Sequence, residues 1–282
     1  KGKDPHILVV TATPIPRTLA LSFYGDLEVF TLKERPFESE IITKCLYREE
    51  LDKIINFILK ELKSGKQAYF TYPVIFESSS EDMKNALSMY EELKNIYFKD
   101  FSVGLLHGKL LSEEKEQIMS DFSSNKIQVL VSTTVIEVGI DVPNATIMVI
   151  ENAERYGLST LHQLRGRIGR SHNKSYCFLV VPKKLTDDAK LRLKVFVSIK
   201  DGFELSEQDL KMRGPGQMLG FRQSGIMDFK LNDFISDYEL IKDVKIDSDE
   251  LIKSIKNIDN LPSELIKLKN FHIEYYENSL TN

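Results

Sequence analysis

The stretch IITKCLYREELDKIINFILKELKSGKQAYFTY, residues 41–72, decides the fold class. Its first seven residues and its last six are runs typical of β-strands. Between them, apolar residues recur at the spacing of one helix face, and Gly65 follows the last turn, where a glycine commonly ends a helix. A strand, a helix and a second strand in this order predict a parallel α/β unit, because parallel strands need a crossover connection.

The same alternation continues to about residue 182. Strands are expected at 101–106, 127–132, 145–150 and 176–181, with a helix over 83–97 and others beginning near Ser112 and Leu158. Several of these strands are apolar without alternation, as in a sheet that is covered on both faces. The residues expected to point inward from the helix over 83–97 are Met83, Ala86, Leu87, Tyr90 and Leu93. Residues 41–182 therefore predict one complete doubly wound domain.

The flanking segments differ from this domain. Residues 6–10 predict a buried strand and residues 28–32 a second, followed by a charged linker with Pro36. Thr186 is expected to cap a helix that begins with two aspartates, and only helices and loops are expected after it. The predicted divisions are residues 1–36, 37–185 and 186–282.

Composition describes an ordinary globular chain of 282 residues, with 42% hydrophobic and 28% charged residues. No apolar run approaches the roughly 20 residues of a membrane span, and no signal peptide opens the chain. Cys45 and Cys177 lie in strand-like runs, which predicts two buried reduced thiols. The cysteines and the scattered histidines form no pattern of metal ligands.

The net charge of −4 argues against DNA binding by the whole surface, because DNA affinity rests on neutralised phosphates. Any DNA contact must therefore come from a local basic patch. One candidate patch consists of Arg165, Arg167, Arg170 and Lys174, with no acidic residue among them.

The sharpest local signal is QLRGRIGR, residues 163–170. On a helix, Gln163, Arg167 and Arg170 would share one stripe. Two guanidiniums on one stripe suit a polyphosphate, and arginines of this kind stabilise charge on a transferring phosphoryl group. The alternative is a solvated basic helix face, but the two glycines, each costly within a helix, favour a functional interpretation.

Three further stretches follow strands of the expected sheet. STTVIEVGIDVP, residues 132–143, begins where a buried strand ends, and ligands commonly bind outside the carboxyl ends of such strands. Its two threonines suit a phosphate backbone, although a helix cap is an equal alternative. Residues 11–19, TATPIPRTL, and residues 106–108, LHG, also follow strands, and structural turns are their alternatives.

These stretches resemble conserved motifs of superfamily 2 helicases, which implies a RecA-like fold. Residues 163–170 resemble motif VI, residues 132–143 motif V and residues 11–19 motif III. The residues that the resemblance implies at the nucleotide are Gly139, Asp141, Gln163, Arg167 and Arg170, with Arg167 and Arg170 catalytic and Arg170 the arginine finger. The residues that it implies at DNA are His107, Gly108, Thr133 and Thr134, while Thr11 and Thr13 would couple the two ligands. The family often has His-Arg where this chain has Gln163-Leu164.

Residues 202–225 indicate which superfamily 2 helicases the chain resembles most. Ser206 and Asp209 predict a capping box at a helix start, and Gly214-Pro215-Gly216 a turn after it. The stretch resembles the translocation motif shared by RecG and by the transcription-repair coupling factor Mfd, a helical hairpin that moves duplex DNA. This resemblance implies working roles for Arg213 and Gln223. The Arg-Gly-Pro-Gly form and residues 150–157 favour the RecG family.

The sequence contains no Gly-x4-Gly-Lys-Ser/Thr phosphate loop, and residues 104–110 imitate one with a residue too few between the glycines. Glu151 and Glu154 are interpreted as the polar rim of a cleft. Residues 1–36 resemble the end of a first RecA-like domain, and residues 37–185 the second, followed by the hairpin and a helical extension. We therefore expect no ATP hydrolysis by this chain alone, and no bound metal.

The resemblance implies a bacterial cytoplasmic, nucleoid-associated parent that uses ATP and Mg²⁺ to translocate on duplex DNA. Its partners would be forks and Holliday junctions, together with an N-terminal wedge and a first RecA-like domain, and no membrane. Two alternatives stay open. One is the corresponding part of Mfd, and the other is a non-catalytic module that binds nucleic acid or protein.

Overall fold

The computed structural model describes residues 40–73, 80–133 and 141–213, without the side chains of 80–85 and 213, and isolated positions elsewhere. The chain forms two compact units. The first comprises residues 1–16 and 31–214, and the second comprises residues 17–30 and 215–282. Within the second unit, the described positions between 240 and 270 are helical.

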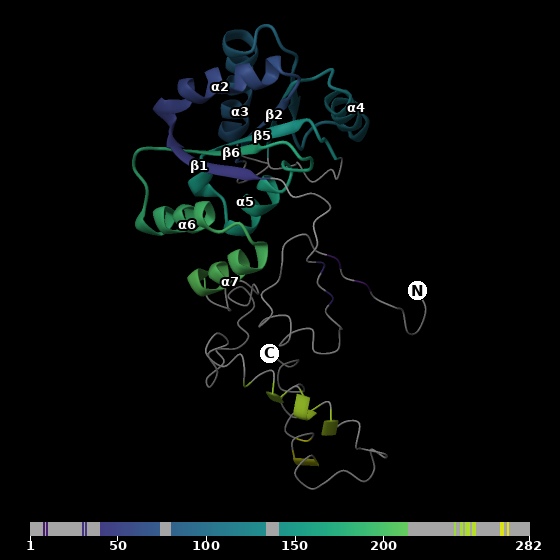
Figure 1. The fold of residues 1–282 in the computed structure, drawn as a ribbon, viewed down its shortest axis with the longest axis vertical. Coiled ribbons are helices and arrows are strands. Elements are labelled where there is room, and N and C mark those ends of the chain that lie inside the picture. The colour runs from purple at the N-terminus through teal and green to yellow at the C-terminus, as the bar shows by residue number, and fades with distance from the viewer. Residues whose placement is uncertain are drawn as a thin grey trace. The chain divides into compact units, whose positions relative to one another are not determined.

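The first unit is built on a six-stranded sheet in which every pair of neighbouring strands is parallel (Figure 1). The spatial order is β1-β6-β5-β2-β4-β3. The strands are β1 (Ile41–Tyr47), β2 (Gln67–Tyr72), β3 (Val103–Leu106), β4 (Val129–Thr133), β5 (Ala145–Glu151) and β6 (Ser175–Val181). This sheet confirms the parallel α/β fold that the strand–helix alternation predicts.

Helices cover both faces of the sheet (Figure 1). The helices are η1 (Arg48–Glu50), α2 (Leu51–Lys63), α3 (Ser80–Glu92), η2 (Leu93–Tyr97), α4 (Ser112–Ser123), η3 (Ala153–Arg155), α5 (Leu158–Arg165), α6 (Asp187–Ser198) and α7 (Gly202–Arg213). α2 and α3 pack on one face around the buried side chains of Ile58 and Phe70. α4, α5 and α6 pack on the other around Phe122, Leu161 and Phe196. The central strands β2, β4 and β5 are buried along their whole length, which explains their lack of alternation.

Two burial predictions are wrong. Leu87 is 42% exposed, because it lies beside, and not on, the buried stripe that contains Ala86, Met89 and Leu93. Cys45 is exposed, because β1 is an edge strand whose one neighbour is β6. Cys177, in β6, is buried as predicted; both cysteines are free thiols, and burial raises the pKa of Cys177 to about 12.

The strands expected at 6–10 and 28–32 are described at four positions, Leu8, Val10, Phe30 and Leu32. All four side chains are exposed and none of these residues is in a strand, so the prediction is wrong at these positions. A strand needs a neighbour for its backbone hydrogen bonds, and no described strand pairs with either segment.

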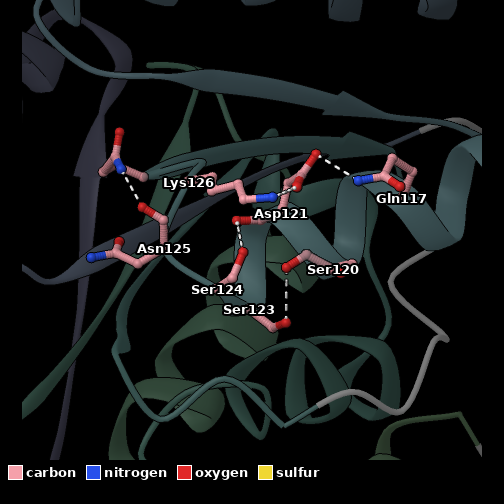
Figure 2. A network of polar contacts seen from close by, with 8 residues as sticks. Gln117, Ser120, Asp121, Ser123, Ser124, Asn125 and Lys126 are labelled. Carbon is pink, nitrogen blue, oxygen red and sulfur yellow. Dashed lines mark hydrogen bonds and ion pairs between the residues drawn. The ribbon is translucent and has the colours of Figure 1, made fainter.

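A polar network fixes the turn between α4 and β4 (Figure 2). Asp121 accepts hydrogen bonds from Gln117 at 3.0 Å and from Lys126 at 3.0 Å. Asn125 takes the left-handed conformation, with φ of 60°, and its carbonyl accepts from Gln128 at 2.6 Å. The network holds the start of β4 beside β3, and therefore fixes where the carboxyl end of β4 emerges.

The helices after the sheet begin at side-chain caps. Thr186 accepts a hydrogen bond from the Ala189 amide at 3.2 Å, which confirms the predicted cap of α6. α7 begins earlier than predicted, because Asp201 accepts from the amides of Phe203 and Glu204, both at 2.9 Å. The capping box predicted at Ser206 and Asp209 is wrong, since both residues are buried within α7.

Candidate functional site at opposite edges of the sheet

The residues expected at DNA lie at the carboxyl edge of the sheet. Tyr72 pairs with Thr133 across β2 and β4, and Leu106 pairs with Ser132 across β3 and β4. His107, the residue after β3, is therefore level with Thr133, the last residue of β4. The structure brings together His107, Gly108 and Thr133, as their positions after parallel strands predict.

Hydrogen bonds within the loop and from α4 hold the loop after β3 in place. The carbonyl of His107 accepts from the Leu110 amide at 3.3 Å, and Lys115 of α4 donates to the Gly108 carbonyl at 2.9 Å. Burial lowers the pKa of His107, and the charges of Lys109 and Lys115 lower it further. The lowered pKa favours the neutral imidazole of His107, which can donate or accept a hydrogen bond without adding a positive charge.

The residues expected at the nucleotide lie at the opposite, amino edge. Asp141 is in the segment that enters β5, and Arg170 is in the segment that enters β6, the neighbour of β5. An Asp141 carboxylate oxygen lies 3.5 Å from an Arg170 guanidinium nitrogen. Strands of four to seven residues separate the two edges by roughly 13–23 Å, so this group is distinct from the His107–Thr133 group.

Arg167 and Arg170 do not share a helical stripe with Gln163, and that prediction is wrong. α5 ends at Arg165, Gly166 caps it, and Gly169 takes the left-handed conformation, with φ of 74°. The glycines thus end the helix and place both arginines on the loop that follows it. Gln163 is an exposed residue of the last turn of α5.

Two contacts hold Arg170 on this loop, and both arginines affect Tyr69. Arg170 donates from Nε to the Gly166 carbonyl at 3.1 Å, in addition to its ion pair with Asp141. Burial raises the pKa of Tyr69 to about 12, against the lowering effect of the Arg167 and Arg170 charges. The charges of both guanidiniums therefore act on the Tyr69 phenol in β2.

Arg165 does not belong to a DNA-binding patch, contrary to prediction. It is 5% exposed and lies over the Phe196 ring, 4.3 Å from its centroid. Its guanidinium donates to the carbonyls of Phe196 at 3.1 Å, Ile199 at 3.0 Å and Lys200 at 3.3 Å. These are carbonyls at the C-terminus of α6 that lack helical partners, and a cation is favourable there.

Lys174, the other member of the expected patch, pairs with Glu40 at 3.5 Å. The basic patch therefore reduces to Arg167 and Arg170. The role of Arg165 was not apparent in the sequence, because its partners lie about 30 residues later and are backbone atoms.

Glu151, interpreted from the sequence as part of the polar rim of a cleft, is almost completely buried. It is the last residue of β5, 1% exposed, and forms an ion pair with Arg48 of η1. Burial raises the pKa of Glu151, and Arg48 counters this shift. A glutamate that ends an otherwise apolar strand was visible in the sequence, but its partner about 100 residues earlier was not.

Several expected site residues lie outside the described residues. These are Thr11, Thr13, Thr134, Gly139 and Gln223. Arg213 is the last residue of α7, and its side chain is not described. Within the described ranges, no group of three or more His, Cys, Asp or Glu residues could hold a metal ion, and no helix is long and apolar enough to cross a membrane.

Two family models match consecutive parts of the chain. The helicase conserved C-terminal domain matches residues 40–172, which contain the sheet and both groups of site residues. The C-terminal part of domain 3 of the ATP-dependent DNA helicase RecG matches residues 199–273. The chain belongs to the RecG helicase family.

Individual RecG proteins agree with this assignment. The ATP-dependent DNA helicase RecG of Bacillus subtilis (strain 168) is 48% identical over 255 residues, covering 90% of this chain and 37% of the relative. RecG of Synechocystis sp. (strain ATCC 27184 / PCC 6803 / Kazusa) is 45% identical over 281 residues, covering 99% of this chain and 33% of the relative. The chain thus spans about a third of the length of these relatives and matches their C-terminal part.

A solved structure supports the fold. The structure of RecG bound to a three-way DNA junction matches 82% of this chain and 30% of its own chain, at 45% identity and a TM-score of 0.65. The six-stranded sheet flanked by helices is therefore the RecA-like helicase domain that the motif resemblance implies.

Proposed function

We propose that this chain provides the second motor domain and the translocation segment of an ATP-dependent helicase that acts on double-stranded DNA. In this proposal residues 1–36 end the first motor domain, residues 37–185 form the second, and residues 186–282 form the translocation hairpin and a helical extension. The observation that carries the proposal is the separation of the two groups of site residues to opposite edges of one rigid sheet.

The amino edge fits the phosphates of ATP. Arg167 and Arg170 offer planar forks of donors at fixed charge, and Asp141 holds Arg170 at 3.5 Å until phosphate oxygens compete for it. We assign Arg167 and Arg170 as the catalytic residues, and Gly139, Asp141 and Gln163 as further nucleotide contacts. ATP hydrolysis supplies the free energy for movement, and the arginines would stabilise negative charge on its γ-phosphate.

The rest of the ATP site would lie on the first motor domain. The sequence has no Walker A phosphate loop, and the described residues offer no carboxylate cluster for Mg²⁺. This chain alone would therefore not hydrolyse ATP, whereas the full-length parent would use ATP and Mg²⁺.

The carboxyl edge fits a DNA backbone. A threonine hydroxyl and a neutral imidazole, at adjacent strand ends, suit phosphate and sugar contacts that carry no sequence information. We assign His107, Gly108, Thr133 and Thr134 to DNA, and Thr11, Thr13, Arg213 and Gln223 to the coupling of ATP turnover to movement.

A continuous set of contacts connects the nucleotide edge to the translocation segment. Arg170 is bonded to Gly166 at the end of α5, and Arg165, in the last turn of the same helix, is bonded to the end of α6. α7 begins within a few residues of that point and leads to Arg213. A displacement of the arginine loop on nucleotide binding would therefore be passed to α7 through hydrogen bonds and not through a flexible linker.

The substrate of the proposed parent is branched DNA. The related RecG structure contains a three-way junction, and we extend this partner to the present family member, together with replication forks and Holliday junctions. The proposed cellular process is the remodelling of stalled forks and the migration of junctions in recombination and repair.

Replacing Arg213 with alanine in the full-length parent tests the coupling. We expect unwinding of a synthetic fork to fall by more than about tenfold while ATP turnover stays within about twofold, because interactions lost only in translocation leave the ATP site intact. Fork unwinding and phosphate release are measured on the same sample, with Lys211→Ala, two residues earlier in α7 and exposed, as the control. A non-catalytic binding module would instead bind the fork equally with and without ATP and leave it paired.

A further inference from the structure

A cavity of about 390 Å³ opens at the carboxyl ends of β2, β5 and β6, against α3. This volume is in the range of about 300–1,000 Å³ that is usual for small-molecule sites. Met89, Val180, Val181 and Pro182 provide apolar walls, and Tyr72 provides an aromatic one. The charged groups that line the cavity are Arg48, Glu92 and Glu151.

Glu151 brings an unused acceptor to this cavity. The residue is 1% exposed, and one carboxylate oxygen pairs with Arg48. Its other oxygen, Oε1, is buried and has no hydrogen-bond partner among the described residues. A buried carboxylate oxygen is costly without a donor, so the cavity favours a ligand that supplies one.

Arg48 brings donors to the same place. Glu151 fixes one nitrogen of its guanidinium, and the other terminal nitrogen lies 3.6 Å from the Met89 sulfur. The side chain is still 41% exposed, so the guanidinium is oriented without being enclosed. The carboxylate of Glu151, an acceptor, and the guanidinium of Arg48, a donor, therefore lie side by side between apolar walls.

The cavity also continues the row of residues assigned to DNA. Thr71 pairs with Ile150, so Tyr72 and Glu151 end their strands at one level, and Tyr72 pairs with Thr133. From β5 through β2 and β4 to β3, the row is thus Glu151, Tyr72, Thr133 and His107. Its strands are about 4.8 Å apart, so the row is about 15 Å long.

We propose that this cavity holds an unpaired nucleobase of the strand whose backbone lies along the row, an inference that rests on the proposed DNA-binding function. Flipped or single-stranded bases are held between aromatic and apolar side chains and by hydrogen bonds to the Watson–Crick edge. Every base presents a donor beside an acceptor on that edge, which matches Glu151 and Arg48. A phosphate fits less well, because two carboxylates face one guanidinium.

The test measures the binding of this chain to single-stranded oligonucleotides of one length, either with bases throughout or with central abasic sites. We expect the intact strand to bind at least about fivefold more tightly, because a good pair of base-edge hydrogen bonds gives roughly 1–3 kcal/mol of discrimination. Ser88→Phe places a ring in the cavity from an exposed position and should abolish the difference. Leu87→Phe adds the same ring at the next, exposed position, which does not line the cavity, and should preserve it.

A second variant tests the hydrogen bonding. Glu151→Gln keeps the size of the side chain but replaces one acceptor with a donor, so the order of affinities for the four homopolymers should change. Equal binding of intact and abasic strands, or an unchanged difference in Ser88→Phe, would overturn the nucleobase cavity alone. No binding of either strand would overturn both the nucleobase cavity and the assignment of the carboxyl edge of this chain to a DNA strand.

Discussion

Replacing Arg170 with alanine in the full-length parent is expected to lower its DNA-stimulated ATP turnover by roughly 10³-fold or more, the usual contribution of an arginine finger. The physical reason is the loss of the guanidinium that the Gly166 carbonyl and Asp141 hold in place, at 3.1 Å and 3.5 Å. The measurement is phosphate release at saturating fork DNA, with ATP affinity measured separately by a fluorescent analogue.

Two variants control this experiment. Lys174→Ala removes a nearby exposed charge that pairs with Glu40, and turnover should stay within about twofold. Arg170→Lys keeps the charge but not the planar fork, and should recover only a small part of the rate. Near-normal ATP turnover in Arg170→Ala would contradict the assignment of Arg170 as a catalytic residue.

Replacing Arg165 with alanine is expected to lower the free energy of unfolding of the motor domain by about 3–5 kcal/mol. The change removes three hydrogen bonds from a cation to backbone carbonyls, of which the one to Phe196 is buried and those to Ile199 and Lys200 are partly buried. It also leaves a void over the Phe196 ring, which the guanidinium covers at 4.3 Å. Urea unfolding of this chain, followed by circular dichroism, measures the change.

The matched control for Arg165 is Lys190→Ala on α6. Lys190 forms an exposed pair with Asp187 at 2.9 Å, and its loss should leave the urea midpoint nearly unchanged. If Arg165→Ala unfolds at the same urea concentration as the parent chain, the buried guanidinium does not anchor α6.

The sequence predicted the sheet well because burial is encoded locally. Strands such as β5 and β6 are largely apolar runs, and α2 repeats its apolar residues at helical spacing, so neither pattern depends on knowing the neighbouring elements. Whether a strand lies at the edge of the sheet is not encoded locally. Cys45 was placed in the core because its strand resembles the others, and only the spatial order shows that β1 has one neighbour.

For the candidate site, the sequence predicts which residues belong to it but not how they are arranged. The octet 163–170 predicts Arg167 and Arg170 as a pair, but the predicted helical stripe is wrong because α5 ends at Arg165, with Gly166 as its cap. The partners of Arg165 and Glu151 are distant in sequence, so burial and pairing could not be inferred from local pattern. The assignment of residues to DNA and nucleotide stays a prediction.

The central claim is that DNA and nucleotide engage opposite edges of one sheet, and photocrosslinking of the full-length parent tests it most directly. A photoreactive residue is placed in turn at Gly108, on the carboxyl edge, and at Gln163, near the amino edge. We predict crosslinks to fork DNA from position 108 and none from 163, and crosslinks to ATP from 163 and none from 108. Both ligands crosslinking from the same position, or the reverse pattern, would contradict the account.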